Sequence, residues 1–151
     1  MLEINNLTRV KVEKSFLKKT FQAVLDFLKI KRPFEVSLVL VGKDRIRKLN
    51  KKYRNYDKAT DVLAFPFFYY QEGKESLPKR FKQDNFLGEI VICLPFAKEQ
   101  SLKAGHSLKR ELTVLFVHGI LHLLGFNHES NDKGKSEKMK DLEKRILKKL
   151  K

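Results

Sequence analysis

Residues 107–128 read SLKRELTVLFVHGILHLLGFNH, and this stretch sets the architecture of the chain. Ser107 is a favourable residue for capping a helix, and the residues after it, as far as Leu124, are apolar on nearly every side. A helix of this composition has to be buried all round. We therefore expect a central, buried helix that carries His118 and His122 and around which the other elements pack.

Apolar and β-branched runs elsewhere predict strands, and apolar stripes at helical spacing predict further helices. The expected strands are residues 2–5, 34–41, 61–65 and 88–94. The expected helices are a segment from Ser15 that ends by Pro33, a short segment over 46–53, residues 95–104, the central helix and an amphipathic tail over 139–150. Residues 71–85 are polar and predict a surface loop or lid.

Strands and helices follow one another here without a regular βαβ rhythm, which favours an α+β (mixed α/β) fold class. We expect about four strands in a mixed sheet and five or so helices around the buried central helix with its histidine motif. Neither an internal repeat nor a linker interrupts the chain, so residues 1–151 are expected to form one domain.

The composition is strongly basic, with 33 Lys and Arg against 18 Asp and Glu and a net charge of +15. Such an excess opposes compact folding through self-repulsion, and it is typical of proteins that bind nucleic acid or an anionic membrane surface. The alternative is a lysine-rich solvated surface of the kind common at high growth temperature. The charge alone favours a polyanionic partner.

The cysteine content and the length of the apolar segments indicate the cellular compartment in which the protein works. Cys93 is the one cysteine, which excludes an internal disulfide and favours a reducing compartment. The first residues show no signal-peptide pattern. The most apolar stretch, residues 112–126, is too short to span a membrane. We expect a soluble, cytoplasmic protein with no membrane partner and no dinucleotide cofactor.

The motif H-x3-H-x2-G-x2-H joins His118, His122 and His128. The first two lie four residues apart, on one face of a helix and about one turn from each other. On a continuous helix His128 would lie about 9 Å further along and could not reach the same point. Gly125 can adopt the left-handed conformation that stops a helix and turns the chain back. The spacing therefore predicts three imidazoles around one transition-metal ion.

The alternative for these histidines is a hydrogen-bonded place in the core, which would bury three polar rings with no evident partner. Imidazole ligands bind zinc, and they also bind nickel, copper or iron. Zinc is the default among these metals and is the expected cofactor. Because imidazoles are neutral, the ion would keep its double charge and acidify a water at an open position. Cys93 or His106 could close the site as a fourth ligand, but local spacing places neither. We expect an open, catalytic site.

Metzincin proteases share this spacing in the motif H-E-x-x-H-x-x-G-x-x-H, where the glutamate is the general base. The corresponding residue here is Gly119, which has no side chain. Peptide hydrolysis by that route loses its proton acceptor.

From about Leu40 onward the chain resembles the YbeY endoribonucleases, metal-dependent enzymes of bacterial ribosomal RNA maturation. Four blocks carry the resemblance in matching order and spacing: residues 49–54 (LNKKYR), 60–66 (TDVLAFP), 87–92 (LGEIVI) and 118–125 (HGILHLLG). The chain departs from the family pattern at Glu89, where family members usually have Asp, and at Asn127, where Asp usually precedes the third histidine.

The resemblance implies one YbeY-like metallohydrolase domain, a metal ion held by the three histidines, and single-stranded RNA as substrate. It also implies a catalytic arginine, which matches Arg54. A planar guanidinium can contact two phosphoryl oxygens as charge develops on them. Glu89 and His106 are further candidates, each as a group that hydrogen-bonds to a ligand histidine, although His106 also fits a surface residue at a helix start.

The expected function is a metal-dependent, single-strand-specific endoribonuclease, a hydrolase of phosphodiester bonds. The resemblance implies work on ribosomal particles, in maturation of the 3′ end of small-subunit ribosomal RNA and in ribosome quality control. One alternative is a non-enzymatic ribosome assembly factor whose metal serves only the fold. Another is a metallohydrolase of a different substrate, such as a peptide. The aromatic run at residues 67–70 could stack on RNA bases, but buried packing at a strand end is the favoured interpretation.

Overall fold

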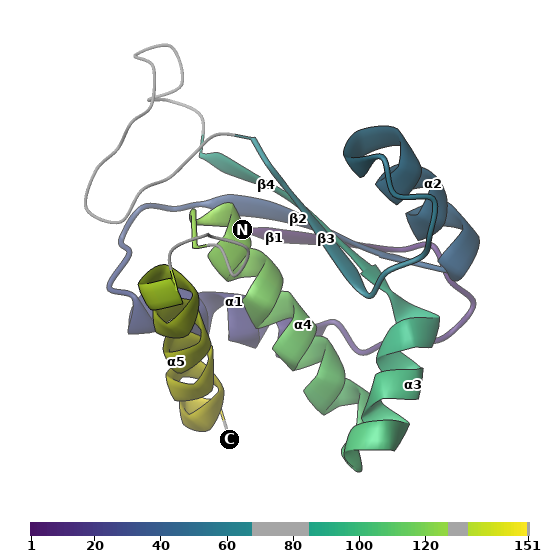
Figure 1. Ribbon diagram of the computed structural model, residues 1–151. Helices are drawn as coiled ribbons and strands as arrows, with labels where there is room; N and C mark the ends of the chain where they lie inside the picture. The colour runs from purple at the N-terminus through teal and green to yellow at the C-terminus, as the bar shows by residue number, and fades with distance from the viewer. Residues whose placement is uncertain (68–84, 127–132, 151) are drawn as a thin grey trace.

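The computed structural model describes residues 1–67, 85–126 and 133–150 (Figure 1). The predicted loop at 71–85 therefore lies, except for Asn85, outside the described residues, and so do Asn127 and His128. Among the residues described, no helix is both long and apolar enough to cross a membrane.

A four-stranded mixed sheet forms one layer of the molecule. Its strands are β1 (Leu2–Asn6), β2 (Glu35–Val41), β3 (Val62–Pro66) and β4 (Phe86–Cys93). The order across the sheet is β1-β2-β4-β3, with β1 and β4 parallel to β2 and β3 antiparallel to β4. Each strand lies on a predicted apolar run, which confirms the α+β fold class.

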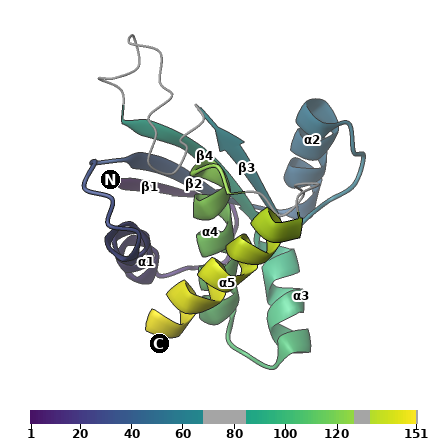
Figure 2. The ribbon, with the colours of Figure 1, turned by 60° about the vertical axis from the view of Figure 1, so that its left-hand side comes forward.

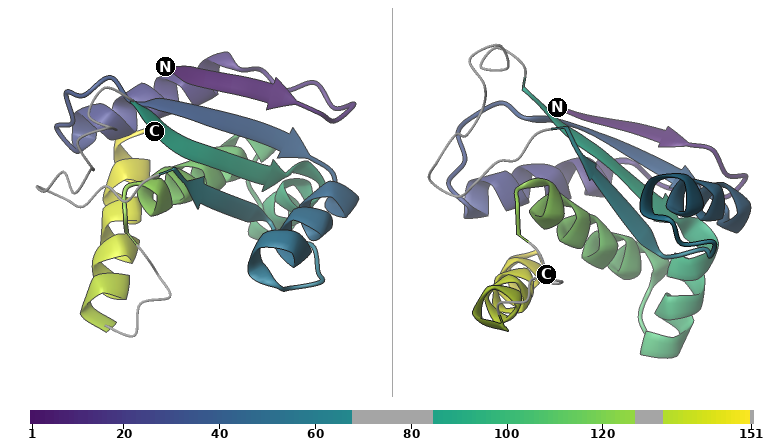
Figure 3. Two further views of the ribbon diagram at one scale, coloured as in Figure 1. Left: turned by 90° about the horizontal axis from the view of Figure 1, so that it is seen from above. Right: turned by 45° about the horizontal axis from the view of Figure 1, so that its top comes forward.

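Helices cover both faces of this sheet. They are α1 (Ser15–Phe27), α2 (Lys43–Arg54), α3 (Leu94–Ala104), α4 (Leu108–Leu123) and α5 (Lys133–Lys149). Figures 1 and 3 show α1 and α4 beneath the sheet and α2 against its other side, near the edge formed by β3. Figure 2 shows α5 crossing α4 on the side away from the sheet. The main core lies between the sheet and α1, α4 and α5, and a smaller cluster lies under α2.

The central helix predicted from residues 107–128 is α4. The Ser107 hydroxyl accepts a hydrogen bond from the Arg110 N–H at 3.0 Å, so the predicted cap is present. Ten of the helix's residues are buried, and they face the sheet and the helices around it. The prediction of a helix buried all round is confirmed.

The helices α2 and α5 begin earlier than predicted, at Lys43 and Lys133. Two further differences have a clear physical reason, and the first is the end of α1. The helix ends at Phe27 rather than near Pro33, because Lys29 adopts a left-handed conformation with φ of 57°. The N–H of Ile30 then donates to the carbonyl of Leu25 at 2.9 Å and closes the last turn. A closing turn of this kind ends a helix before a downstream proline can.

The second detail is Phe67, the described member of the aromatic run 67–70. The prediction of buried packing is wrong for this residue, which is 48% exposed. β3 ends at Pro66, and the Phe67 N–H still donates to the Leu87 carbonyl of β4 at 3.0 Å, while the Phe67 ring lies at the surface and contacts Phe86 at 5.6 Å between ring centroids. Residues 68–70 lie outside the described part of the chain.

Gly119 allows α4 to lie close to the sheet. A Cβ atom built on Gly119 would lie 2.8 Å from Cγ2 and 3.0 Å from Cδ1 of Ile90 in β4. Both distances are shorter than carbon atoms normally approach. The glycine therefore has a packing role, and a glutamate at this position would not fit without moving the helix or Ile90.

We expect Gly119→Ala to destabilise the protein. Overpacking against Ile90 should cost about 1–3 kcal/mol, and the better helix propensity of alanine should return about 1 kcal/mol. Urea unfolding of the wild type and the variant measures the net loss. In an Ile90→Ala background, which removes the contacting atoms, Gly119→Ala should cost less, and an equal cost in both backgrounds would contradict this packing role.

Candidate active site

The C-terminal end of α4 turns the chain at Gly125. Its φ of 95° is the predicted left-handed conformation. The N–H of Gly125 donates to the His122 carbonyl at 3.0 Å, and the N–H of Phe126 donates to the Leu121 carbonyl at 2.9 Å. This pair of bonds is a Schellman motif, which satisfies the last carbonyls of a helix. The turn therefore forms as predicted, while the position of His128 beyond it stays a prediction.

His118 and His122 come together in the last turns of α4. Their Nε2 atoms lie 2.9 Å apart, and their ring centroids lie 4.4 Å apart with planes at 64°. The spacing of four residues places both rings on one face of the helix, and both Nε2 atoms are directed at one point.

Glu143 of α5 holds the other side of His118. Its Oε1 atom lies 2.6 Å from Nδ1 of the imidazole, and its side chain is 19% exposed. A carboxylate accepts a hydrogen bond from Nδ1–H, so it favours the tautomer that leaves the lone pair of His118 on Nε2. The sequence reasoning missed this residue. The sequence feature that could have identified Glu143 is a carboxylate on the apolar face of α5, four residues after the buried Met139.

A polar cleft of about 440 Å³ opens beside the two histidines. Three separate segments of the chain supply its polar walls: the end of α2, the loop that leads into β3, and α4. The polar side chains that line it belong to Arg54, Thr60, Asp61, His118 and His122. Sequence positions far apart therefore meet at one site.

Arg54 is the last residue of α2, which ends because Asn55 adopts a left-handed conformation with φ of 61°. The Arg54 Nη2 donates a hydrogen bond to the Ala64 carbonyl of β3 at 3.0 Å. Within the described residues this is the hydrogen bond that the guanidinium makes. It fixes one edge of the group against the sheet and leaves other N–H donors for a ligand in the cleft.

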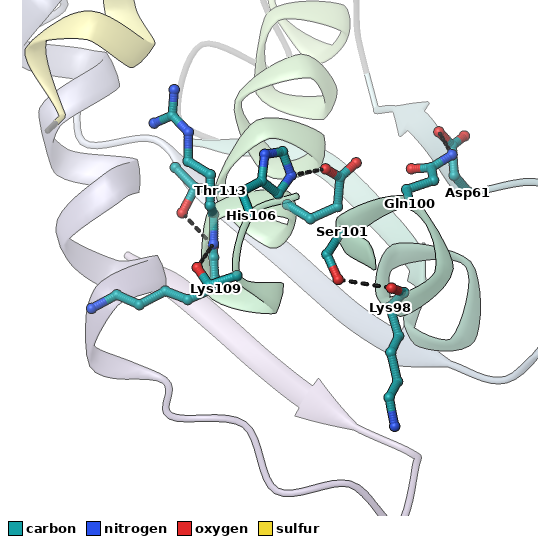
Figure 4. Close-up of polar contacts among 10 residues, drawn as sticks. Asp61, Lys98, Gln100, Ser101, His106, Lys109 and Thr113 are labelled. Carbon is teal, nitrogen blue, oxygen red and sulfur yellow. Dashed lines mark hydrogen bonds and ion pairs between the residues drawn. The ribbon is translucent and has the colours of Figure 1, made fainter. Parts of the chain in front are cut away.

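The loop between α2 and β3 is fixed by its own side chains. Asp61 accepts from the Val62 N–H at 2.8 Å and from the Gln100 side chain at 3.3 Å (Figure 4). At the other end of the loop, Arg47 of α2 donates to Asp57 at 2.8 Å. This hydrogen bond lowers the pKa of the Asp57 carboxyl below its ordinary value. The contacts of Asp61 therefore hold the part of the loop that lines the cleft, while the Arg47–Asp57 pair lies outside the cleft wall.

The structure does not bring His106 or Glu89 to the histidine pair. His106 lies just before α4, at the opposite end of the helix from the cleft, and its Nε2 is 2.5 Å from the buried carboxylate of Glu111 (Figure 4). Glu89 lines a groove on the α2 side of the sheet. Because side chains alternate along a strand, Ile90 faces α4 and Glu89 faces away from it.

Cys93, the other possible fourth ligand, lies in the small core cluster under α2. Burial raises the pKa of its thiol, which disfavours the thiolate that binds metals. Over the described ranges, no group of three or more His, Cys, Asp or Glu side chains is arranged to hold a metal ion. The described part of the site therefore offers two imidazole ligands, His118 and His122.

The chemistry of this pair fits a transition-metal ion. The two Nε2 atoms lie at hydrogen-bond distance, 2.9 Å, so one ring donates an N–H to the lone pair of the other, and a metal ion bound by both nitrogens would replace that proton. Metal–nitrogen distances of about 2.0–2.1 Å in a tetrahedral site require the nitrogens to lie about 3.3 Å apart. The Nε2 atoms of His118 and His122 reach that spacing if they move apart by a few tenths of an ångström. Glu143 favours the His118 tautomer whose Nε2 is free of hydrogen and can bind a metal.

Converging imidazoles beside an arginine in a polar cleft are typical of hydrolases that act on phosphate esters. Comparisons with known proteins agree with this class. The family described as Endoribonuclease YbeY matches residues 3–151. The chain belongs to this family, which its four sequence blocks predicted.

Individual relatives cover nearly the whole chain. An Endoribonuclease YbeY of Acetivibrio thermocellus is 40% identical over 138 residues, which are 89% of this chain and 84% of the relative. One from Caldicellulosiruptor bescii is 37% identical over 147 residues, or 95% and 92% of the two chains. A solution structure of a Thermotoga maritima protein, 28% identical, superposes with a TM-score of 0.63 over 99% of this chain and 89% of that protein.

Proposed function

We propose that this protein is a metal-dependent, single-strand-specific endoribonuclease that matures the 3′ end of small-subunit ribosomal RNA and takes part in ribosome quality control. Membership of the YbeY family supports an endoribonuclease of ribosomal RNA processing. The observation that carries the metal dependence is the convergence of His118 and His122 on one point of a cleft that Arg54 also lines. Ribosomal particles as partners and a cytoplasmic location belong to the same proposal.

In this proposal His118, His122 and His128 hold one transition-metal ion, with zinc the expected metal. The ion, when bound, supplies a Lewis acid that polarises a phosphoryl oxygen and acidifies water. Arg54 contacts the phosphoryl oxygens and stabilises the negative charge that develops on them. Because the Ala64 carbonyl already fixes its guanidinium, little reorganisation is needed during the reaction.

The charges around Arg54 suit an RNA strand. The end of α2 and the loop after it carry the exposed side chains of Lys51, Lys52, Arg54 and Lys58. Neutralising backbone phosphates with such side chains releases counterions, so RNA binding should weaken steeply as salt rises. The net charge of +15 acts in the same direction.

Two features of the structure disfavour the alternative functions, which are a peptidase and a non-enzymatic assembly factor whose metal serves only the fold. A peptidase of the metzincin type needs a general base at position 119, where this chain has a glycine whose added Cβ would already press on Ile90. A purely structural zinc site is closed by four protein ligands. Here His118 is 28% exposed and lines the cleft, and neither Cys93 nor His106 reaches it.

The experiment that tests the proposal compares single-stranded and duplex RNA of the same sequence. Metal-free protein, protein reloaded with zinc and an identically purified His122→Ala variant are incubated with each substrate. We expect only the zinc-loaded wild type to cleave, and only the single strand. Chelation should leave the far-ultraviolet circular dichroism unchanged. Unfolding on chelation would support the structural-metal alternative, and equal cleavage by His122→Ala would trace the activity to a contaminant.

Glu143→Gln should weaken zinc binding by about 10- to 100-fold, because a neutral amide holds the His118 tautomer less firmly than a carboxylate does. Competition with a chromophoric chelator measures the affinity. Asp141→Asn is the matched control, since it removes a negative charge from an exposed position of the same helix. Equal zinc affinities for the two variants would show that the contact with His118 has no role in metal binding.

A further inference from the structure

A second hollow, of about 370 Å³, lies next to the cleft on the α2 side of the sheet. Four aromatic rings and one carboxylate line it, and we refer to it as the aromatic groove: Tyr53, Phe65, Phe67, Phe86 and Glu89. Pro66 lines both the groove and the cleft, and Tyr53 directly precedes Arg54. The groove therefore adjoins the cleft at Pro66, where an RNA strand that leaves Arg54 can continue.

The aromatic groove presents unusually exposed rings. Tyr53 is 58% exposed and Phe67 is 48% exposed. Each packs edge-on or tilted against a ring of the sheet, Tyr53 on Phe65 at 5.4 Å and Phe67 on Phe86 at 5.6 Å. Such contacts hold the rings in position while leaving ring surface open to solvent. Aromatic rings beside a positively charged surface are the usual platform for the bases of single-stranded nucleic acid.

The Glu89 carboxylate gives the groove a specific polar group. It is partly buried, and among the described residues it makes no hydrogen bond or ion pair. A partly buried carboxylate beside aromatic rings favours a ligand with N–H donors. The base edge that suits it best is that of guanine, whose N1–H and N2–H are parallel donors for two carboxylate oxygens. Adenine and cytosine offer an amine beside an acceptor, and uracil offers no amine.

We propose that the aromatic groove is a nucleobase subsite that stacks the base next to the phosphate held by Arg54 and favours guanine through Glu89. This proposal rests on the proposed nuclease function, since it assigns part of the same substrate. It also gives Glu89 a role different from the contact with a ligand histidine that its sequence position suggested.

The test measures binding rather than cleavage, using metal-free protein and short fluorescent RNAs. One RNA is oligouridine, and the others carry a single guanine, adenine or cytosine in the same background. We expect the guanine-containing RNA to bind about tenfold more tightly than oligouridine. In Glu89→Gln this preference should disappear, so that the guanine-containing RNA and oligouridine bind with equal affinity. An undiminished guanine preference in Glu89→Gln would overturn the proposal.

Stacking is tested by a second pair of variants. Tyr53→Leu should weaken binding of every RNA by about tenfold, because it removes a stacking surface. Tyr56→Leu is the matched control: Tyr56 is 60% exposed on the same segment but does not line the groove. Equal effects of the two substitutions would overturn the stacking role, provided that both variants unfold at the wild-type temperature.

Failure of the subsite and failure of the nuclease function can be told apart. His122→Ala should lose cleavage while keeping the guanine preference, because its imidazole lies in the cleft and outside the groove. Cleavage by the wild type without any base preference would refute the subsite alone. Absence of both RNA cleavage and RNA binding would refute the nuclease proposal on which the subsite rests.

Discussion

The His122→Ala variant is expected to lose RNA cleavage by a factor of about 10² or more and to bind zinc far more weakly than the wild type. The imidazole of His122 meets that of His118 at 2.9 Å, and its removal leaves the proposed site with two ligands instead of three. Single-turnover cleavage of single-stranded RNA and chelator competition measure the two losses. Circular dichroism should show a folded protein, because His122 lines an open cleft.

His106→Gln is the matched control for this variant. Glutamine can keep a hydrogen bond to the buried Glu111, and His106 lies at the opposite end of α4 from the cleft. Its cleavage rate and zinc affinity should equal those of the wild type. A comparable loss in His106→Gln would mean that substitutions along α4 act through the fold rather than through the metal site.

Arg54→Ala should lower the cleavage rate by about 10²–10³, the range found when one preorganised donor to a developing oxyanion is removed. Zinc affinity should not change, because Arg54 bonds to the Ala64 carbonyl and not to a histidine. Arg54→Lys should recover only part of the activity, since an ammonium group cannot contact two phosphoryl oxygens in a planar arrangement. Measurements at saturating RNA separate this loss from weaker substrate binding.

Arg47→Ala is the charge-matched control for Arg54. It removes one positive charge from the same helix, and its exposed ion pair with Asp57 contributes little to stability. We expect normal cleavage at saturating RNA. A large loss of cleavage in Arg47→Ala would show that the general positive charge of α2, and not the guanidinium in the cleft, supports the reaction.

Local sequence patterns were sufficient for α4 and for two of the three proposed metal ligands. Apolar residues on every side predict a buried helix wherever the rest of the chain lies, and a spacing of four residues places His118 and His122 on one face. Gly125 is equally local, since its left-handed conformation closes the helix through bonds to residues within the last turns. Family resemblance, and not spacing, indicated Arg54.

Contacts between segments far apart in the chain could not be predicted from local sequence patterns. Glu143 is 25 residues from His118, and only the packing of α5 across α4 brings its carboxylate to the imidazole. The close approach of Gly119 to Ile90 depends equally on how α4 lies against the sheet. A charged residue on an amphipathic helix and a glycine in an apolar helix have many possible partners, and the sequence does not choose among them.

By itself, then, the sequence determined the central helix, the turn at its end and the convergence of two imidazoles, because each depends on dihedral preferences and spacings within a few residues. The tertiary structure decided which carboxylate supports His118 and which face of the sheet Glu89 occupies. Strand register and helix packing set those outcomes, since they sum many weak contacts between segments far apart in the chain.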